Sequence, residues 1–333
     1  MSTAYAFEPA RQHSYRDHPE SPSRLDLLET QLSGSGAEQL AFQAASEAEV
    51  ALVHSPELIQ SIKDVCAQGS AIIDPAPTFV TRTSFDDALR AAGATLACLH
   101  AITQGHVRNA FSVVRPPGHH AEPDQSMGFC LFNNIAIAAS QAVADGLSRV
   151  AIIDYDAHHG NGTQAAFLDD DRVAYLSTHQ WGIYPGTGWY EEAEHARGRI
   201  VNVPLPAGTG DAAYDQIAVQ VIEPFVRRFR PEFMLVSAGF DAHWSDPLTS
   251  LGLSTAGFHA LSSRLIQLAD DQCGGKILFV LEGGYDPVNL ANGVQAVFSA
   301  LTGRRFSDPL DAAQRDEPDI APLLETIRAL HGI

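Results

Sequence analysis

The chain has 333 residues, of which 45% are hydrophobic and 18% are charged. This length and composition allow a sizeable core and fit one large α/β domain. Lysine and arginine number 21 against 40 aspartate and glutamate residues, which gives a formal net charge of −19. So acidic a surface repels DNA phosphates, and the charge therefore argues against direct nucleic-acid binding.

The cysteines and the chain start bear on the cellular compartment. Four scattered cysteines form no Cys-x-x-Cys pair, so we expect neither a thiolate zinc site nor a disulfide framework, and a reducing compartment is favoured. The N-terminal residues lack the basic region and apolar run of a secretory signal. No apolar stretch approaches the ~20 residues that span a bilayer. We therefore expect a cytoplasmic protein without membrane contact.

The predicted elements alternate between helices and short apolar strands. In chain order, Ser55 before Pro56 indicates a helix start. Helical patterns follow at 84–104, 132–146, 211–229, 255–272 and 288–302, and strands are predicted at 110–114, 149–153, 173–177, 233–237 and 276–281. Near-continuous hydrophobicity in the strands is typical of a parallel sheet covered on both faces. We expect a single α/β domain over residues 1–333, with a helical tail over about 303–333.

Polar residues and glycine turns follow each predicted strand. They occupy residues 115–120, 154–162, 178–179, 238–241 and 282–285. Ligands bind at the carboxyl ends of the strands in open α/β sheets, and closed barrels place their sites at the same end. One composite site at this edge is therefore predicted, whereas the pattern leaves the sheet topology open.

Asp156 and His158 form the clearest candidate for a metal site. In extended chain their spacing points both side chains to the same side. One carboxylate and one imidazole suit zinc, and a catalytic zinc takes three protein ligands with one position left for water. Asp241, which follows another predicted strand, is the best third ligand. Alone, the Asp-x-His spacing is more typical of a helix cap than of a metal site.

Two adjacent histidines, His119 and His120, follow a Pro-Pro-Gly turn. Amide hydrolysis needs a base for water and an acid for the leaving amine, and histidine serves as both near neutral pH. A partner such as Asp154 favours a charged imidazole, whereas the neutral amide of Asn161 orients its partner without charging it. Tyr285, after two glycines, can present a phenol to an oxyanion.

Together, these motifs resemble the histone deacetylases, closest to the class II and bacterial histone-deacetylase-like and acetylpolyamine amidohydrolase branch. The resemblance runs in order from about residue 18 to 290. It is carried by His18-Pro19-Glu20-Ser21-Pro22-Ser23-Arg24, Arg115-Pro116-Pro117-Gly118-His119-His120, Gly128-Phe129-Cys130, Asp154-Tyr155-Asp156-Ala157-His158-His159-Gly160-Asn161-Gly162, Tyr184-Pro185-Gly186-Thr187-Gly188, Ser237-Ala238-Gly239-Phe240-Asp241 and Glu282-Gly283-Gly284-Tyr285.

The resemblance implies the arginase–deacetylase fold, with a central parallel sheet and helices on both faces. It implies one zinc ion per chain on Asp156, His158 and Asp241. His120 is implied as the general base and then acid, oriented by Asn161. His119, paired with Asp154, is implied to give electrostatic help and proton transfer, and Tyr285 to hold the oxyanion beside zinc. A tyrosine at the last position argues for an active deacetylase.

The same resemblance implies a substrate tunnel. Gly128 and Phe129 lie at one wall and Tyr184 at the other, where phenylalanine is usual. Leu248 matches a rim position that carries glutamate in polyamine-specific relatives, which weakens a strict polyamine interpretation. Ser84 resembles a serine that accepts the substrate amide hydrogen.

Potassium is implied as well. The likeness assigns one ion to Asp154, Asp156, His158, Ser177 and Thr178. It further suggests a second cation near Phe167, Asp170 and Val173.

The expected activity is hydrolysis of acetyl-lysine or a similar acylated amine to acetate and free amine. Acetylpolyamine or another small amide is the alternative substrate on the same site, and acyl length is open. A two-manganese ureohydrolase needs further bridging carboxylates, which the Asp156-Ala157-His158-His159-Gly160 and Asp241-Ala242-His243 segments lack. A non-catalytic module for acetylated ligands is the other rival. Relatives suggest a dimer or tetramer.

Overall fold

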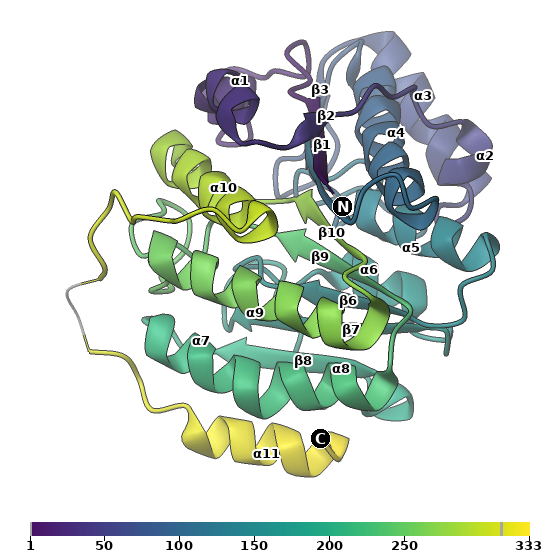
Figure 1. The fold of residues 1–333 in the computed structure, drawn as a ribbon. Helices are drawn as coiled ribbons and strands as arrows, with labels where there is room; N and C mark the ends of the chain where they lie inside the picture. The colour runs from purple at the N-terminus through teal and green to yellow at the C-terminus, as the bar shows by residue number, and fades with distance from the viewer. Residues whose placement is uncertain (1, 314–315) are drawn as a thin grey trace.

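All five predicted strands form, and they lie in one parallel sheet. The computed structural model describes residues 2–313 and 316–333. Its main sheet has eight strands in the order β2-β1-β5-β10-β9-β6-β7-β8, and every pair of neighbours is parallel (Figure 1). The predicted strands are β5(Asn109–Val114), β6(Val150–Asp154), β7(Val173–Gln180), β9(Phe233–Ala238) and β10(Ile277–Leu281). The expected parallel sheet is thus confirmed.

The sequence pattern missed the strands at both ends of this sheet. They are β1(Thr3–Glu8), the short β2(Glu38–Gln39) and β8(Ile200–Leu205). Polar residues form both ends of β1, and β8 contains Pro204, which an edge strand tolerates because one side of it forms no ladder. A separate antiparallel pair joins β3(Ala71–Ile72) and β4(Phe79–Val80).

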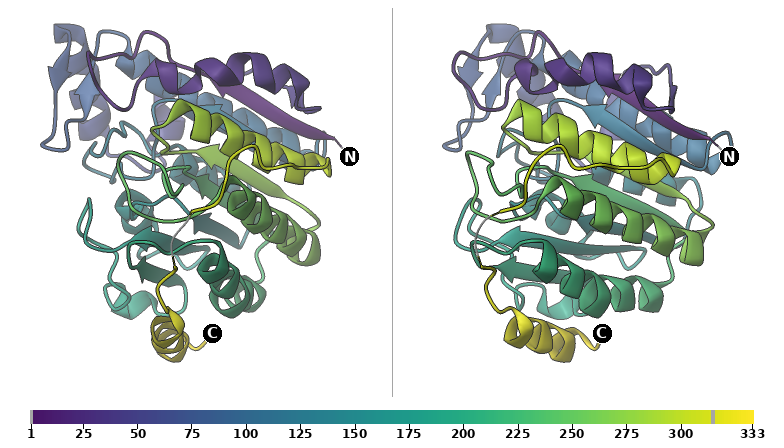
Figure 2. Two further views of the ribbon diagram at one scale, coloured as in Figure 1. Left: turned by 90° about the vertical axis from the view of Figure 1, so that its left-hand side faces the viewer. Right: turned by 60° about the vertical axis from the view of Figure 1, so that its left-hand side comes forward.

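The helices cover both faces of the sheet, as expected. Figures 1 and 2 show α7 to α10 as one layer, with α4 and α5 on the opposite face. The helices are α1(Asp26–Gln31), α2(Glu47–Val50), α3(Pro56–Gln68), α4(Ser84–Thr103), α5(Asn134–Ala144), α6(Asn161–Phe167), α7(Asp211–Ile217), α8(Glu223–Phe229), α9(Thr255–Cys273), α10(Pro287–Thr302) and α11(Ala321–His331). A π-helical turn over Ala218–Ile222 joins α7 to α8, and the hydroxyl of Ser55 accepts from Leu58 N at 3.2 Å to cap α3.

Burial on both faces explains the unbroken apolar runs. Successive side chains of a strand point to opposite faces. In β6, Ala151 and Ile153 pack with the helices α7 to α10, whereas Val150 and Ile152 pack with α4 and α5. A polar residue at any of these positions would lose a core contact, so polar and apolar residues cannot alternate along the strand.

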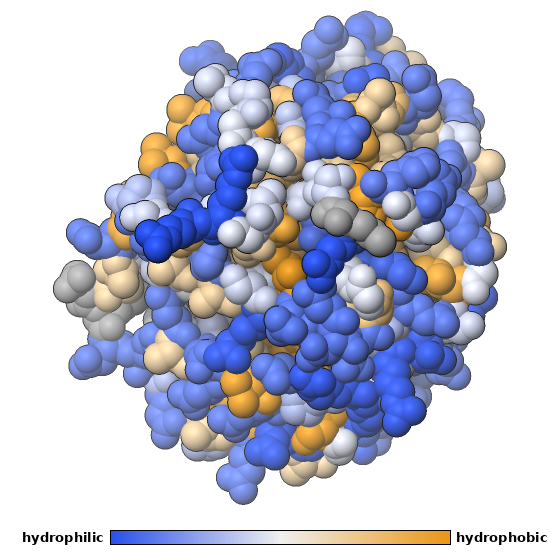
Figure 3. Space-filling model, in the orientation of Figure 1, coloured by the Kyte–Doolittle hydropathy of each residue, from blue (hydrophilic) through white to orange (hydrophobic). Residues whose placement is uncertain are grey.

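The C-terminal tail is helical only in its last part. Among the described residues after α10, the helix α11 alone is regular, and it lies beside β8 at the end of the sheet far from β1 (Figure 2). Pro309 and Pro318 interrupt the segment before it, because proline cannot donate a helical hydrogen bond. The face in Figure 3 is mainly hydrophilic, with small scattered apolar groups. No helix of the described residues is long and apolar enough to span a bilayer.

A buried ion cluster fixes the N-terminal segment to the carboxyl edge of the sheet. Glu20 lies between Arg24 and Arg115, and all three residues are at most 1% exposed. Arg115 Nη2 donates to Glu20 Oε2 at 2.7 Å, and Arg24 Nη1 donates to Oε1 at 2.9 Å. Arg24 also donates to the carbonyls of Glu282 and Gly284 at 2.8 and 2.6 Å. The turn before Tyr285 is therefore held by a buried arginine.

Removing the Glu20 carboxylate is expected to destabilise the fold strongly. In Glu20→Ala two buried guanidinium groups lose their counter-ion, so the free energy of unfolding should fall by about 3–5 kcal/mol in chemical denaturation. Glu29→Ala, which removes an exposed partner of Arg11, is the matched control and should change it by less than about 1 kcal/mol. A small effect of Glu20→Ala would contradict the role of the cluster.

The Glu20 carboxylate makes the stability of the fold depend on pH. Burial would raise the pKa of Glu20, but the charges of Arg115 and Arg24 outweigh burial and lower it to about 2 from an ordinary 4.5. Its stabilising contribution is therefore present above pH 4.5 and lost as the pH falls towards 2. Glu20→Ala should flatten the stability profile in that interval.

Candidate metal centre and active site

Strand ends that are distant in sequence meet at one edge of the sheet. Asp154, the last residue of β6, is the register partner of both Ser177 in β7 and Ser237 in β9. Leu281, the last residue of β10, pairs with Ala238 of β9. The loops that leave these strands therefore begin side by side, as the sequence predicted.

Asp156, His158 and Asp241 come together in these loops. One potential ligand atom from each lies within 4.8 Å of the other two. His158 Nδ1 is 2.9 Å from Asp241 Oδ2 and 3.2 Å from Asp156 Oδ1. Both aspartates are 0% exposed. Among the described residues this is the one such group of three histidine, cysteine or acidic side chains.

Backbone amides hold the two carboxylates in place. Ala157 N donates to Asp241 Oδ1 at 2.9 Å, and Gly283 N donates to Asp156 Oδ2 at 2.8 Å. The chain also passes so close to Asp156 that a Cβ on Gly239 would lie 1.9 Å from Oδ2. A glycine is therefore required in the loop after β9.

The carboxylates of this group attract positive charge. Burial would raise the pKa of Asp156, but the charge of His119 and the bonds from His158 outweigh burial and lower it far below its ordinary value. Burial alone would lower the pKa of His158. The charge of Asp241 and the bonds to both carboxylates outweigh burial and raise this pKa to about 10. The pocket thus favours positive charge between the carboxylates. Two carboxylates and one imidazole fit a divalent metal ion with an open position.

The two adjacent histidines have different partners. His119 Nδ1 lies 3.1 Å from Asp154 Oδ2, whereas His120 Nδ1 lies 2.8 Å from Asn161 Oδ1. Burial opposes a charge on His119, but Asp156 and Asp154 raise its pKa to about 10. Burial and the neighbouring His119 charge lower the pKa of His120 well below 6.5. The pair therefore combines one charged and one neutral imidazole.

An open cleft of about 270 Å³ leads to this group. Its walls are mainly apolar and aromatic, with two imidazoles and two phenols among them. They are formed by Ala76, His120, Gly128, Phe129, His158, Ile183, Tyr184, Leu248 and Tyr285. The predicted tunnel residues Gly128, Phe129, Tyr184 and Leu248 thus share one cleft with His120.

The wall at Gly128 and Phe129 depends on an unusual backbone. Both residues have positive φ angles, 58° and 68°. A Cβ on Gly128 would lie 2.5 Å from the His120 ring, so this position also requires glycine. Asp74, in the loop that carries Ala76, accepts from Gly128 N at 3.2 Å and fixes the wall.

Tyr285 reaches the cleft from the turn after β10. Its amide donates to Asp246 Oδ2 at 2.8 Å, and the Arg24 guanidinium lies 5.0 Å from its ring centre. Burial, followed by the Asp241 charge, raises the pKa of Tyr285 well above 10. The phenol therefore keeps its proton and can donate a hydrogen bond into the cleft.

Ser84 does not lie in the cleft, which corrects the sequence interpretation. This serine begins α4 and is 0% exposed. Its Oγ accepts from Thr81 N at 2.7 Å and lies 2.6 Å from His13 Nδ1. The hydroxyl closes a buried turn and is not available to a ligand.

Three contacts around the histidines had no signal in the sequence. Asn161 Nδ2 donates to Glu122 Oε1 at 2.7 Å, which directs Oδ1 of the amide towards His120. Tyr175 donates to Asp154 Oδ2 at 3.0 Å, and Glu282 Oε2 accepts from the amides of Gly118 and His119. Glu282 stands within a quoted motif and Glu122 lies two residues after one, but their contacts are with residues distant in the sequence.

Comparison with known proteins shows the family of this chain. The model of the histone deacetylase domain matches residues 18–301. The chain belongs to the histone deacetylase family. The members of this family are deacetylase and amidohydrolase enzymes, so the protein is an enzyme of that type.

Individual relatives agree with this assignment. The chain is 38% identical to "Histone deacetylase 10, chloroplastic" of Oryza sativa subsp. japonica, over 99% of this chain and 81% of that one. It is 38% identical to "Histone deacetylase-like amidohydrolase" of Pseudomonas aeruginosa, over 91% and 83%. The crystal structure of the HDA15 HD domain superposes with a TM-score of 0.89 at 34% identity, over 99% of this chain and 94% of that one. The histone deacetylase fold is thus confirmed.

The close approach at Gly239 predicts a loss of metal affinity in this deacetylase-family chain. In Gly239→Ala the new methyl group displaces the Asp156 carboxylate, so metal affinity should fall about ten-fold or more. Competition with a chromophoric chelator measures it. Gly34→Ala, at a position with nothing within 4 Å of the new methyl group, should bind metal normally. Equal affinity in both variants would show that Asp156 can move without cost.

Proposed function

We propose that this protein is a zinc-dependent deacetylase that hydrolyses acetyl-lysine or a similar acylated amine. The observation that carries the proposal is the convergence on one cleft of three ligand side chains, the His119–His120 pair and Tyr285. An apolar cleft suits an acyl chain, while the polar groups gather where the amide would stop. Asp156, His158 and Asp241 would hold the zinc.

The side chains of this chain divide the proton chemistry between them. When bound, zinc supplies a Lewis acid that polarises the acetyl carbonyl and acidifies water. His120, neutral and oriented through Nδ1 by Asn161, takes the proton from water and later delivers it to the leaving amine. His119, charged against Asp154, stabilises negative charge nearby and assists proton transfer. Tyr285 donates its phenol hydrogen to the oxyanion.

The cleft suits a slender acylated amine. Phe129 and Tyr184 form the walls, and Leu248 at the rim is 43% exposed. The rim position therefore presents no charge to a second amino group of a polyamine, which favours a single acylated lysine side chain. The buried hydroxyl of Tyr184 has no hydrogen-bond partner among the described residues.

Potassium beneath the zinc site is part of the proposal. Asp154 and Ser177 are register partners at adjacent strand ends, and Thr178 follows in the same strand. With the carbonyls of Asp156 and His158 they offer oxygen atoms only, which suits a hard monovalent cation. Such an ion would stabilise the buried Asp154 carboxylate.

The ureohydrolase alternative finds no second ligand group in the part of the chain that the structure describes. His243, two residues after Asp241, lies 3.1 Å from Ser245 Oγ through Nδ1 and is not part of the metal cluster. A second metal ion would need bridging carboxylates there. A measured content of one metal ion per chain would therefore support the deacetylase.

Metal removal and substrate choice test the proposal together. Chelated protein should release no acetate, and one equivalent of zinc per chain should restore release. The substrates are acetyl-lysine peptides, acetylputrescine, acetylspermidine and longer acyl-lysines, with acetate or acid release as the readout. We expect acetyl-lysine peptides to be the best substrates. Urea release with two bound metal ions would favour a ureohydrolase, and tight binding without turnover would favour a non-catalytic module.

Substitution of Tyr285 tests its assigned role. Tyr285→Phe removes one oxyanion donor, so kcat should fall by roughly 10²–10³. The zinc content should not change, because the phenol is not a ligand. Tyr15→Phe, on the surface at 38% exposure, is the control and should keep full activity. Near-normal turnover of Tyr285→Phe would remove the tyrosine from the mechanism.

A further inference from the structure

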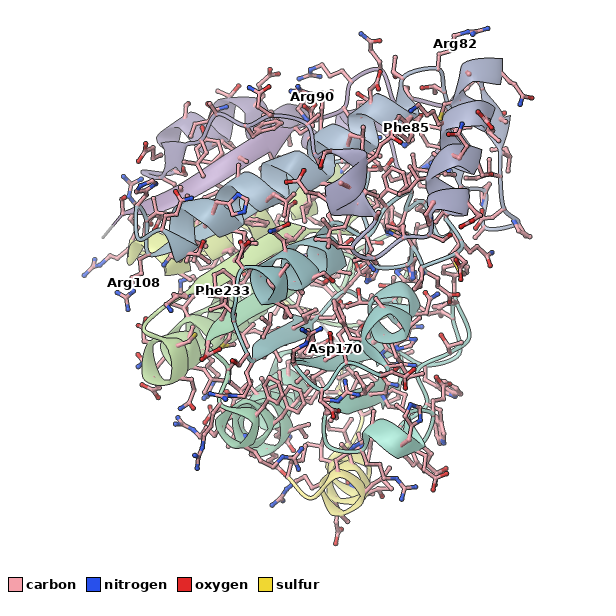
Figure 4. The ribbon with its side chains drawn as sticks, turned by 90° about the vertical axis from the view of Figure 1, so that its right-hand side faces the viewer. Arg82, Phe85, Arg90, Arg108, Asp170 and Phe233 are labelled. Atoms are coloured by element: carbon pink, nitrogen blue, oxygen red, sulfur yellow. The ribbon has the colours of Figure 1, made fainter. Side chains whose placement is uncertain are left out.

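Four backbone carbonyls converge on the side chain of Arg199. Arg199 Nη1 donates to the oxygens of Phe167, Asp170 and Val173 at 2.7, 3.0 and 3.0 Å. Nη2 donates to Leu168 O at 2.6 Å. We call these four carbonyls the carbonyl ring. They belong to the end of α6, the loop after it and the first residue of β7 (Asp170 is labelled in Figure 4).

The carbonyl ring is built to receive positive charge. Its first oxygens come from the end of α6, where helical carbonyls lack partners within the helix and carry partial negative charge. Three consecutive aspartates, residues 169–171, adjoin it, and Asp171 Oδ1 lies 3.2 Å from Arg199 Nε. Four converging carbonyl oxygens repel one another unless a cation lies between them. The Arg199 side chain is 13% exposed, so this cation is largely shielded from water.

Three of these carbonyls belong to the residues for which the family resemblance suggested a second cation. Those residues, Phe167, Asp170 and Val173, all bond to Arg199 Nη1 instead. The guanidinium fills the centre, so the residues present do not fit an additional ion. We propose that Arg199 is a covalently attached replacement for a monovalent cation, and that the carbonyl ring becomes a potassium site when this side chain is removed.

The position of Arg199 links the ring to the active-site edge. Tyr175 N donates to Arg199 O at 2.9 Å, and the Tyr175 hydroxyl donates to Asp154. Helix α6, whose last turn the guanidinium holds, begins with Asn161, the partner of His120. A tethered cation holds this helix independently of the salt in solution, whereas a bound ion would dissociate at low potassium. The inference concerns the scaffold and does not depend on the deacetylase chemistry.

Thermal unfolding of Arg199→Ala in two salts tests the proposal. Loss of the four bonds should lower Tm by about 5 °C in tetramethylammonium chloride. Potassium chloride at the same ionic strength should then recover about 2 °C at a ten-fold excess over its dissociation constant. The readout is the potassium response of the variant minus that of the unmodified protein, because a potassium site at Asp154 would contribute equally to both.

Arg172→Ala is the matched control. Arg172 bonds the Asp170 carboxylate at 2.8 Å and is 59% exposed, but it donates to none of the four carbonyls. This variant should show no additional potassium response. An equal response in both variants, or none in Arg199→Ala, would overturn the latent cation site.

A second measurement avoids dependence on the folding of Arg199→Ala. Crystals of the unmodified protein soaked in rubidium chloride should give no anomalous peak inside the carbonyl ring. A rubidium peak there would mean that Arg199 leaves the ring readily and does not replace an ion. Arg199→Lys keeps one positive charge, so its Tm should lie between those of the unmodified protein and Arg199→Ala, with little response to potassium.

Discussion

The burial of acidic side chains at the carboxyl edge of the sheet is the constraint on which the site depends. Four of them are 0% exposed, namely Asp154, Asp156, Asp241 and Glu282. A buried carboxylate is costly unless it is hydrogen-bonded or paired with positive charge. Imidazoles and backbone amides meet part of this need, and the proposed divalent ion between Asp156 and Asp241 would meet the rest. The same burial that is costly for the acidic side chains favours the binding of a metal ion between them.

Close backbone approach is the second requirement, and it explains the glycine-rich turns. Gly283 N can donate to Asp156 Oδ2 only because no side chain intervenes, since a Cβ there would lie 2.6 Å from that oxygen. The turn then continues to Tyr285, and Arg24 fixes it by bonding the Gly284 carbonyl. One short turn thus orients a ligand and delivers the phenol. Chemistry and backbone geometry are therefore coupled at this turn.

The sequence predicted those parts of the fold and site that depend on local pattern. Continuous apolar runs identified the central strands, because both faces of the sheet are buried, but β1 and β8 carry polar residues or proline and were missed. The two-residue spacing identified Asp156 and His158 as candidate metal ligands. The assignment of Asp241 as the third ligand required the assumption that strand ends converge. Ser84 was misassigned because a short local likeness cannot report burial. Contacts such as Asn161 with Glu122 depend on loop paths that no periodicity encodes.

The positive charges that balance buried oxygen atoms in this molecule are of two kinds, arginine side chains and the proposed metal ions. Three buried or nearly buried cations are side chains of the protein itself, namely Arg24, Arg115 and Arg199. They therefore stay in place at any salt concentration. The proposed metal ions are exchangeable. An exchangeable ion is useful where a coordination position must open to water, whereas a fixed guanidinium serves better where only shape is required. Confining exchange to the strand ends beside His120 would let metal loss stop the chemistry while the three guanidinium groups stay in place elsewhere in the fold.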